Sequence, residues 1–192
     1  MWPWEHLAFG YVLYSLSVRF TTGAAPRGDA VAVAGFATLL PDLVDKPLSW
    51  TFDITATGYS VAHSVFAAPV LLAAASLLSR RVDRPHLFGA FAVGYGSHLL
   101  GDIVYPAIRG DGFWVHAVLW PVLEREAAPT SGIVANASRY FLRFLHELLT
   151  GGLSGILLFE LTLVAAVGLL WVVDGFPVAT GLYRAVAGRR RD

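Results

Sequence analysis

Long apolar blocks separated by short polar connections run along the whole chain. The five blocks are residues 7–18, 30–40, 59–79, 87–105 and 152–173. A helix needs about 20 apolar residues to cross a hydrocarbon core of roughly 30 Å, and the third and fifth blocks reach that length. The first two are shorter, so we expect their helices to continue through Glu5-His6 and through residues 41–45. The pattern predicts an all-α transmembrane helix bundle of about five spans.

A sixth segment has a different pattern. Across residues 139–149, Arg139, Arg143, His146 and Glu147 fall on one helical stripe, and aromatic and leucine side chains fall on another. This arrangement is typical of a helix that lies in the membrane interface. We therefore expect one membrane domain over 1–192, with a core at 1–123, a loop with an amphipathic helix at 124–151, and the last span and a basic tail at 152–192.

Composition agrees with a membrane protein. Hydrophobic residues make up 56% of the chain and charged residues 15%, against about 25% charged in ordinary soluble domains. The formal net charge is +0, which leaves no large basic surface for nucleic acid. Cysteine is absent, so a metal would have to be held by nitrogen and oxygen ligands.

Basic residues predict the orientation, because short cytoplasmic loops carry the excess of Lys and Arg. Arg80, Arg81 and Arg84 separate the third and fourth blocks, and residues 189–191 near the end of the chain are all arginine. Five spans place both regions inside. We expect a multi-pass protein of the inner (plasma) membrane with its N-terminus outside, its C-terminus in the cytoplasm and membrane lipids around it.

Histidine and aspartate collect at the outer ends of four predicted spans. A charged residue at the centre of a membrane helix costs roughly 2.5 to 3.5 kcal/mol on insertion scales, so such residues are functional candidates by default. The set consists of His6, Asp42, Asp45, His63, His98 and Asp102.

Spacing favours a metal site within this set. His98 and Asp102 are an i, i+4 pair, and Asp42 and Asp45 are an i, i+3 pair, so each pair shares a helical face. Imidazoles with carboxylates suit zinc, manganese or iron, and six ligands are enough for one or two ions, with zinc the first choice. Structural explanations are also open. The histidines could be hydrogen-bonded core residues, Asp42 and Asp45 could cap a turn, and the His6 side chain could extend to water.

Other polar residues stay outside this set. His116 and His146 are not placed among the ligands, and His86 is expected to be solvated. Glu160 has no assigned role. Lys46 follows the acidic pair and could pair with Asp42 or contact a substrate anion.

Five short motifs, in order, resemble a known family. They are His6, Leu-Pro-Asp-Leu-Val-Asp at 40–45, Ala-His-Ser at 62–64, Gly-Ser-His-Leu-Leu-Gly-Asp at 96–102 and Leu-Trp-Pro at 119–121. Together they resemble the membrane-bound metal-dependent hydrolases typified by a LexA-regulated inner-membrane protein, long catalogued as a domain of unknown function. The resemblance covers residues 4–123, with the last span outside it, and implies metal ligands at the six residues above.

A more distant similarity is to zinc-dependent phospholipases C and nucleases, whose downstream His-x-x-x-Glu is missing here. We therefore expect a metal-dependent hydrolase that acts on a lipid-like or other amphiphilic substrate, with phosphoester as first choice and amide or ester second. Asp42 or Asp45 would act as ligand or general base. The alternative is a non-catalytic membrane protein with a structural metal, or a metal carrier. The sequence assigns neither the substrate nor the oligomeric state.

Overall fold

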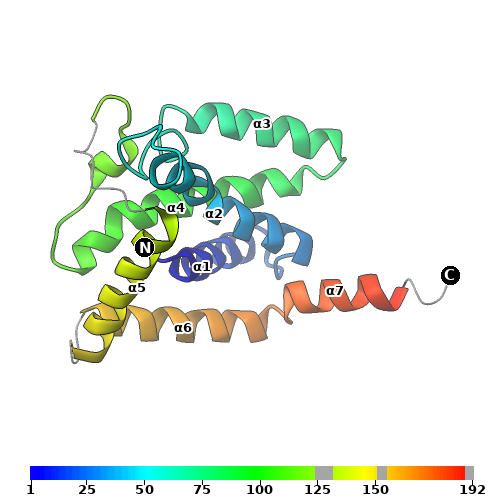
Figure 1. Ribbon diagram of the computed structural model, residues 1–192. Coiled ribbons are helices and arrows are strands. Elements are labelled where there is room, and N and C mark those ends of the chain that lie inside the picture. The colour runs from blue at the N-terminus through cyan, green and yellow to red at the C-terminus, as the bar shows by residue number, and fades with distance from the viewer. Residues whose placement is uncertain (124–131, 151–154, 189–192) are drawn as a thin grey trace. The chain divides into compact units, whose positions relative to one another are not determined.

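The structure is a computed structural model that describes residues 1–123, 132–150 and 155–188 (Figure 1). These residues form helices and no strand, which confirms the all-α class. The basic tail at 189–191 and the first residues of the last predicted span lie outside the described part. In chain order the elements are α1 (Pro3–Thr22), α2 (Gly28–Trp50), α3 (Ala68–Arg81), α4 (His86–Ile108), η1 (Val115–Val118), α5 (Ile133–Thr150), α6 (Gly155–Val173) and α7 (Pro177–Gly188).

Helices α1 and α2 continue through their polar residues, as predicted. Pro3 opens α1, where its missing N–H costs nothing, and Gly23 ends it with a φ of 69°. Pro41 and Pro47 both lie inside α2. Proline lacks the N–H that would bond the carbonyl four residues earlier, so it loosens the helix locally without ending it here.

Two helices in the described part are long and apolar enough to cross a membrane, where the sequence predicted about five spans. They are His86–Ile108, which is α4, and Gly155–Gly181, which covers α6 and the start of α7. The most apolar part of the second is only 6% buried within the protein, so its apolar side chains need an apolar environment outside the chain. Helices α1 and α2 have sufficient length, at 20 and 23 residues, but carry more polar residues.

The prediction of a span at 59–79 was wrong. Helix α3 begins only at Ala68 and has 14 residues, fewer than the roughly 20 that a span needs. Residues 59–67 are irregular, because three of their backbone N–H groups bond to a side chain of α2 instead of to a preceding helical turn. Helix α5, by contrast, covers the predicted amphipathic segment and begins six residues earlier, at Ile133.

The chain divides into two compact units. The first unit contains Met1, Leu40–Leu71 and Leu99–Thr162, and the second contains Trp2–Leu39, Leu72–His98 and Leu163–Asp192. Helices α2, α4 and α6 each pass from one unit into the other without a break.

Small residues let the helices of the second unit approach closely. A Cβ added to Gly94 of α4 would lie 2.3 Å from the backbone oxygen of Ala34 in α2. A Cβ on Gly10 of α1 would lie 2.3 Å from Thr38 Oγ1. Beside these contacts, Tyr14, Ala30, Ala34 and Ala90 form a buried apolar cluster. The close packing fixes the part of α4 that leads into His98.

Candidate metal centre

Asp45 of α2 organises the irregular connection that carries His63. Its Oδ2 accepts hydrogen bonds from the backbone N–H of Ser60 (2.9 Å) and of His63 (3.0 Å), and its Oδ1 accepts one from Ala62 (3.0 Å). The Asp45 side chain is fully buried. One carboxylate therefore replaces helical backbone partners for three residues and holds this segment beside α2.

The same carboxylate also orients the His63 ring. His63 Nδ1 lies 2.8 Å from Asp45 Oδ2. Since a carboxylate only accepts, Nδ1 carries a proton and donates to it. In metal sites, a carboxylate that accepts the proton of the outer ring nitrogen commonly fixes the tautomer of a metal-binding histidine in this way.

The other nitrogen of His63 faces two further carboxylates. Nε2 lies 3.6 Å from Asp42 Oδ1 and 3.4 Å from Asp102 Oδ2, and all three side chains are buried. His63 lies outside both candidate membrane helices. Burial lowers the pKa of its imidazole, but Asp102, Asp45 and Asp42 outweigh burial and raise the pKa to about 9.

Two amino groups lie against the carboxylates of Asp42 and Asp102 in the first unit. Lys46 Nζ lies 2.5 Å from Asp42 Oδ2, one turn along α2. The amino group of Met1 lies 3.0 Å from Asp102 Oδ1. Asp42 and Asp102 thus each have a cationic partner that can move or lose its proton.

The second unit contributes a stacked pair of buried imidazoles. The rings of His6 and His98 are 3.8 Å apart between centroids and 14° from parallel. His98 Nδ1 lies 2.6 Å from the backbone oxygen of Thr38 in α2. A carbonyl only accepts, so the proton of His98 is on Nδ1 and its lone pair is on Nε2.

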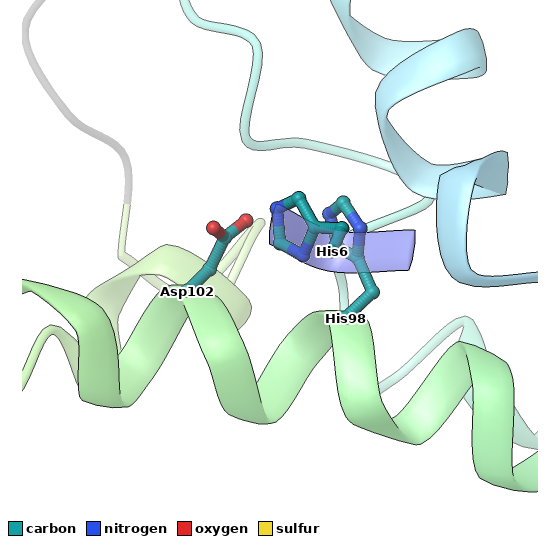
Figure 2. A group of neighbouring side chains, drawn as sticks. All are labelled: His6, His98 and Asp102. Carbon is teal, nitrogen blue, oxygen red and sulfur yellow. The ribbon is translucent and has the colours of Figure 1, made fainter. Parts of the chain in front are cut away.

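Helix α4 connects this pair to the carboxylates. Figure 2 shows His98 and Asp102 on the same side of α4, one turn apart, with the His6 ring beside that of His98. His6, His98 and Asp102 are buried side chains able to hold a metal ion, and Asp42 and His63 add further buried donors.

All six residues predicted as ligands are buried. Five of them offer donor atoms to such groups, whereas the carboxylate of Asp45 is engaged by backbone amides and by His63. Sequence reasoning missed Glu5, which is fully buried in the first turn of α1 and accepts a hydrogen bond from the N–H of Trp2. Its position three residues after Trp2, the residue that precedes the helix, was a signal for capping.

The remaining histidines lie elsewhere. His86 is the first residue of α4 and pairs with Asp29 at 3.2 Å, so it is not simply solvated as predicted. His116 lies near Trp114, and His146 is exposed on α5. Among the described residues, none of these three belongs to a group able to hold a metal.

A family model described as YdjM inner membrane protein matches residues 1–178. No curated protein and no solved structure matches the chain. The match extends well beyond the last motif at 119–121 and includes α6, so the prediction that the last span lies outside the family was wrong. The chain belongs to the YdjM inner membrane protein family, the LexA-regulated family of proposed membrane-bound metal-dependent hydrolases that its motifs resemble.

Proposed function

We propose that this member of the YdjM inner membrane protein family is a metal-dependent hydrolase of lipid-like substrates, with phosphoesters as the preferred class and amides or esters as the second. The observation that carries the proposal is the placement of His63, with one ring nitrogen fixed by Asp45 and the other facing Asp42 and Asp102. A buried imidazole between two carboxylates is a donor set that suits zinc, manganese or iron.

The residues fit one or two such ions. His63, Asp42 and Asp102 provide one nitrogen and two carboxylates in the first unit, and His6 and His98 provide a stacked pair of imidazoles in the second. We propose zinc as the first choice of metal. When bound, the metal would supply a Lewis acid that lowers the pKa of water toward about 7 and polarises the scissile group.

Asp45 and Asp42 have different roles in the proposed reaction. Asp45 already accepts three backbone N–H groups and the His63 proton, so it positions His63. Asp42 pairs with the mobile Lys46 ammonium and faces His63, and its exposure of 8% is the largest among the six residues. Asp42 is therefore the better general base, since it can take a proton from water without releasing the fold around it.

Membrane placement supports the substrate class. The exposed apolar surface of α6 and the amphipathic α5 favour contact with lipid. We propose that the N-terminus lies outside and that the irregular residues 59–67 and the short helix α3 together return the chain to the cytoplasmic side, where the connection with Arg80, Arg81 and Arg84 lies. This topology puts the centre in the outer leaflet. Membrane lipids are then the nearest substrates.

Metal content tests the proposal. Elemental analysis of detergent-purified wild type should find about one or two zinc, manganese or iron ions per chain, and His98→Ala and Asp102→Ala should lose them. His86→Ala and Asp111→Ala are the matched controls, because they remove the same side chains outside the set. Metal-loaded wild type should then release product from lipid phosphoesters. A wild type with no bound metal would sink the proposal.

A structural metal is the second candidate, and the burial of the donors favours it. His63 and His98 are 0% exposed and Asp102 is 3% exposed, as in a closed coordination sphere. A structural ion should exchange slowly with chelator and should be needed for folding, whereas a catalytic ion keeps a position open to water. Slow exchange without any hydrolysis would favour this candidate.

A further inference from the structure

The coordination of a metal by Asp42 does not explain why a lysine, Lys46, lies against the same carboxylate. It is the only lysine in the chain. Its ammonium lies 2.5 Å from Asp42 Oδ2 and 5.6 Å from the centroid of the Trp50 ring, and its side chain is 24% exposed. Lys46 thus connects a buried carboxylate of the centre with a partly exposed aromatic ring.

The aromatic ring belongs to a pair that reaches the amphipathic helix. Trp50 stacks on Tyr140 of α5, with centroids 5.9 Å apart and planes 22° from parallel. The guanidinium of Arg139 lies 5.3 Å from the centroid of the Tyr140 ring. Both Arg139 and Tyr140 are exposed. Within the first unit, two cations therefore lie against one aromatic pair that extends from the acidic cluster to the surface of α5.

A metal on Asp42 would change the position of Lys46. The ammonium of Lys46 neutralises Asp42. A divalent ion held by that carboxylate would neutralise it instead and would repel the ammonium, because like charges a few ångströms apart repel one another in a partly buried site. Lys46 would then need another anion, and its long side chain allows the ammonium to move toward Trp50.

We infer that Lys46 binds the phosphate group of an anionic amphiphile beside the metal, with Trp50, Tyr140 and Arg139 completing the subsite. The inference rests on the proposed function and names the anionic group that the substrate carries. Lys46 and the metal would compete for the same carboxylate, that of Asp42. Metal binding and anion binding are consequently coupled through one side chain.

The simpler explanation is an ordinary i, i+4 ion pair near the end of α2, which stabilises the helix slightly. Under either explanation Lys46 competes with a metal for Asp42. Only the proposed one requires Lys46 to bind phosphate, so the loss of anion binding in a Lys46 variant separates the two.

The test compares Lys46→Gln and Lys46→Arg with wild type in the full chain in detergent. Metal affinity is measured by chelator competition. Lys46→Gln should bind metal at least about tenfold more tightly than wild type, because the competing cation is gone. Lys46→Arg should stay close to wild type. Arg143→Gln, which breaks the exposed pair of Arg143 with Glu147 in the same unit, should change nothing.

Phosphate binding to the metal-loaded protein is the second measurement. Inorganic phosphate and a short-chain phosphatidic acid are the two probes, with short-chain phosphatidylcholine as the zwitterionic comparison. Wild type should prefer the anionic lipid to the zwitterionic one, and Lys46→Gln should lose at least about tenfold in affinity for it. Binding of inorganic phosphate as well would show that the phosphate alone is recognised.

Outcomes separate the two proposals. If wild type holds metal but Lys46→Gln binds both metal and anions as wild type does, the inference is wrong and the hydrolase proposal stands. Absence of metal from wild type would overturn both.

Discussion

Two buried acidic clusters in this protein are neutralised in different ways. In the second unit, Asp174 accepts hydrogen bonds from Tyr11 (2.7 Å), Ser15 (2.7 Å) and Arg19 (2.8 Å to Nε). These three donors are spaced four residues apart on α1. In the first unit, Asp42 and Asp102 face His63, Lys46 and the amino group of Met1.

The difference lies in whether the partners can be exchanged. Arginine keeps its charge at any accessible pH and offers a rigid fork, so Asp174 has a permanent partner and two hydroxyl donors. An imidazole can lose its proton and an ammonium on a long side chain can move. The Asp174 cluster therefore holds α1 to the end of α6, whereas the partners of Asp42 and Asp102 could give way to another cation.

Arg19→Ala should have the largest effect of the substitutions that test this comparison. It leaves the fully buried carboxylate of Asp174 without its cation, and we expect a loss of about 3 kcal/mol in the free energy of unfolding. Thermal unfolding in detergent measures it. Arg27→Ala, which breaks a pair that is 70% and 27% exposed, should cost less than about 1 kcal/mol. If Arg19→Ala stays folded but loses its metal, the Asp174 cluster also serves the metal centre, and the comparison is wrong.

Asp45→Asn should have the next largest effect, and it acts on metal affinity. The amide can no longer hold the His63 proton as a carboxylate does, so affinity should fall about 10- to 100-fold. Chelator competition measures the change, with the exposed Asp53→Asn as control. If a folded variant loses all its metal, Asp45 is itself a ligand, as the sequence predicted. If the metal affinity is unchanged, Asp45 plays no role in metal binding.

Gly94→Ala should have the smallest of these effects. The new methyl group would meet the backbone of α2 at Ala34, which forces the helices apart at a cost of about 1 to 3 kcal/mol. Gly96→Ala on the same helix meets nothing within 4 Å and should be neutral or slightly stabilising. Thermal unfolding curves of the two variants measure the difference. Equal midpoints would show that stability does not depend on the close approach of α4 to α2 at Gly94.

Polar residues within apolar blocks were the most informative part of the sequence. They identified six side chains that are all buried, and they correctly extended α1 and α2 past Glu5-His6 and Pro41. Their role in holding a metal stays a prediction. Hydropathy failed at 59–67, where the decisive partner is a carboxylate 15 to 18 residues upstream. Local periodicity carries no information about such a partner, so the irregular segment that positions His63 could not be predicted.

The four-residue spacing of α4 has a consequence for how this gene can vary in length. Gly94, His98, Asp102 and Pro106 follow one another at intervals of four along a single helix. A one-residue insertion or deletion between any two of them would rotate everything beyond it by about 100°. A substitution at an intervening position changes one side chain only. A single insertion or deletion would instead move the helix contact at Gly94, the imidazole of His98, the carboxylate of Asp102 and Pro106 onto different faces of the helix. Length variation in this family should therefore fall in the connections between helices.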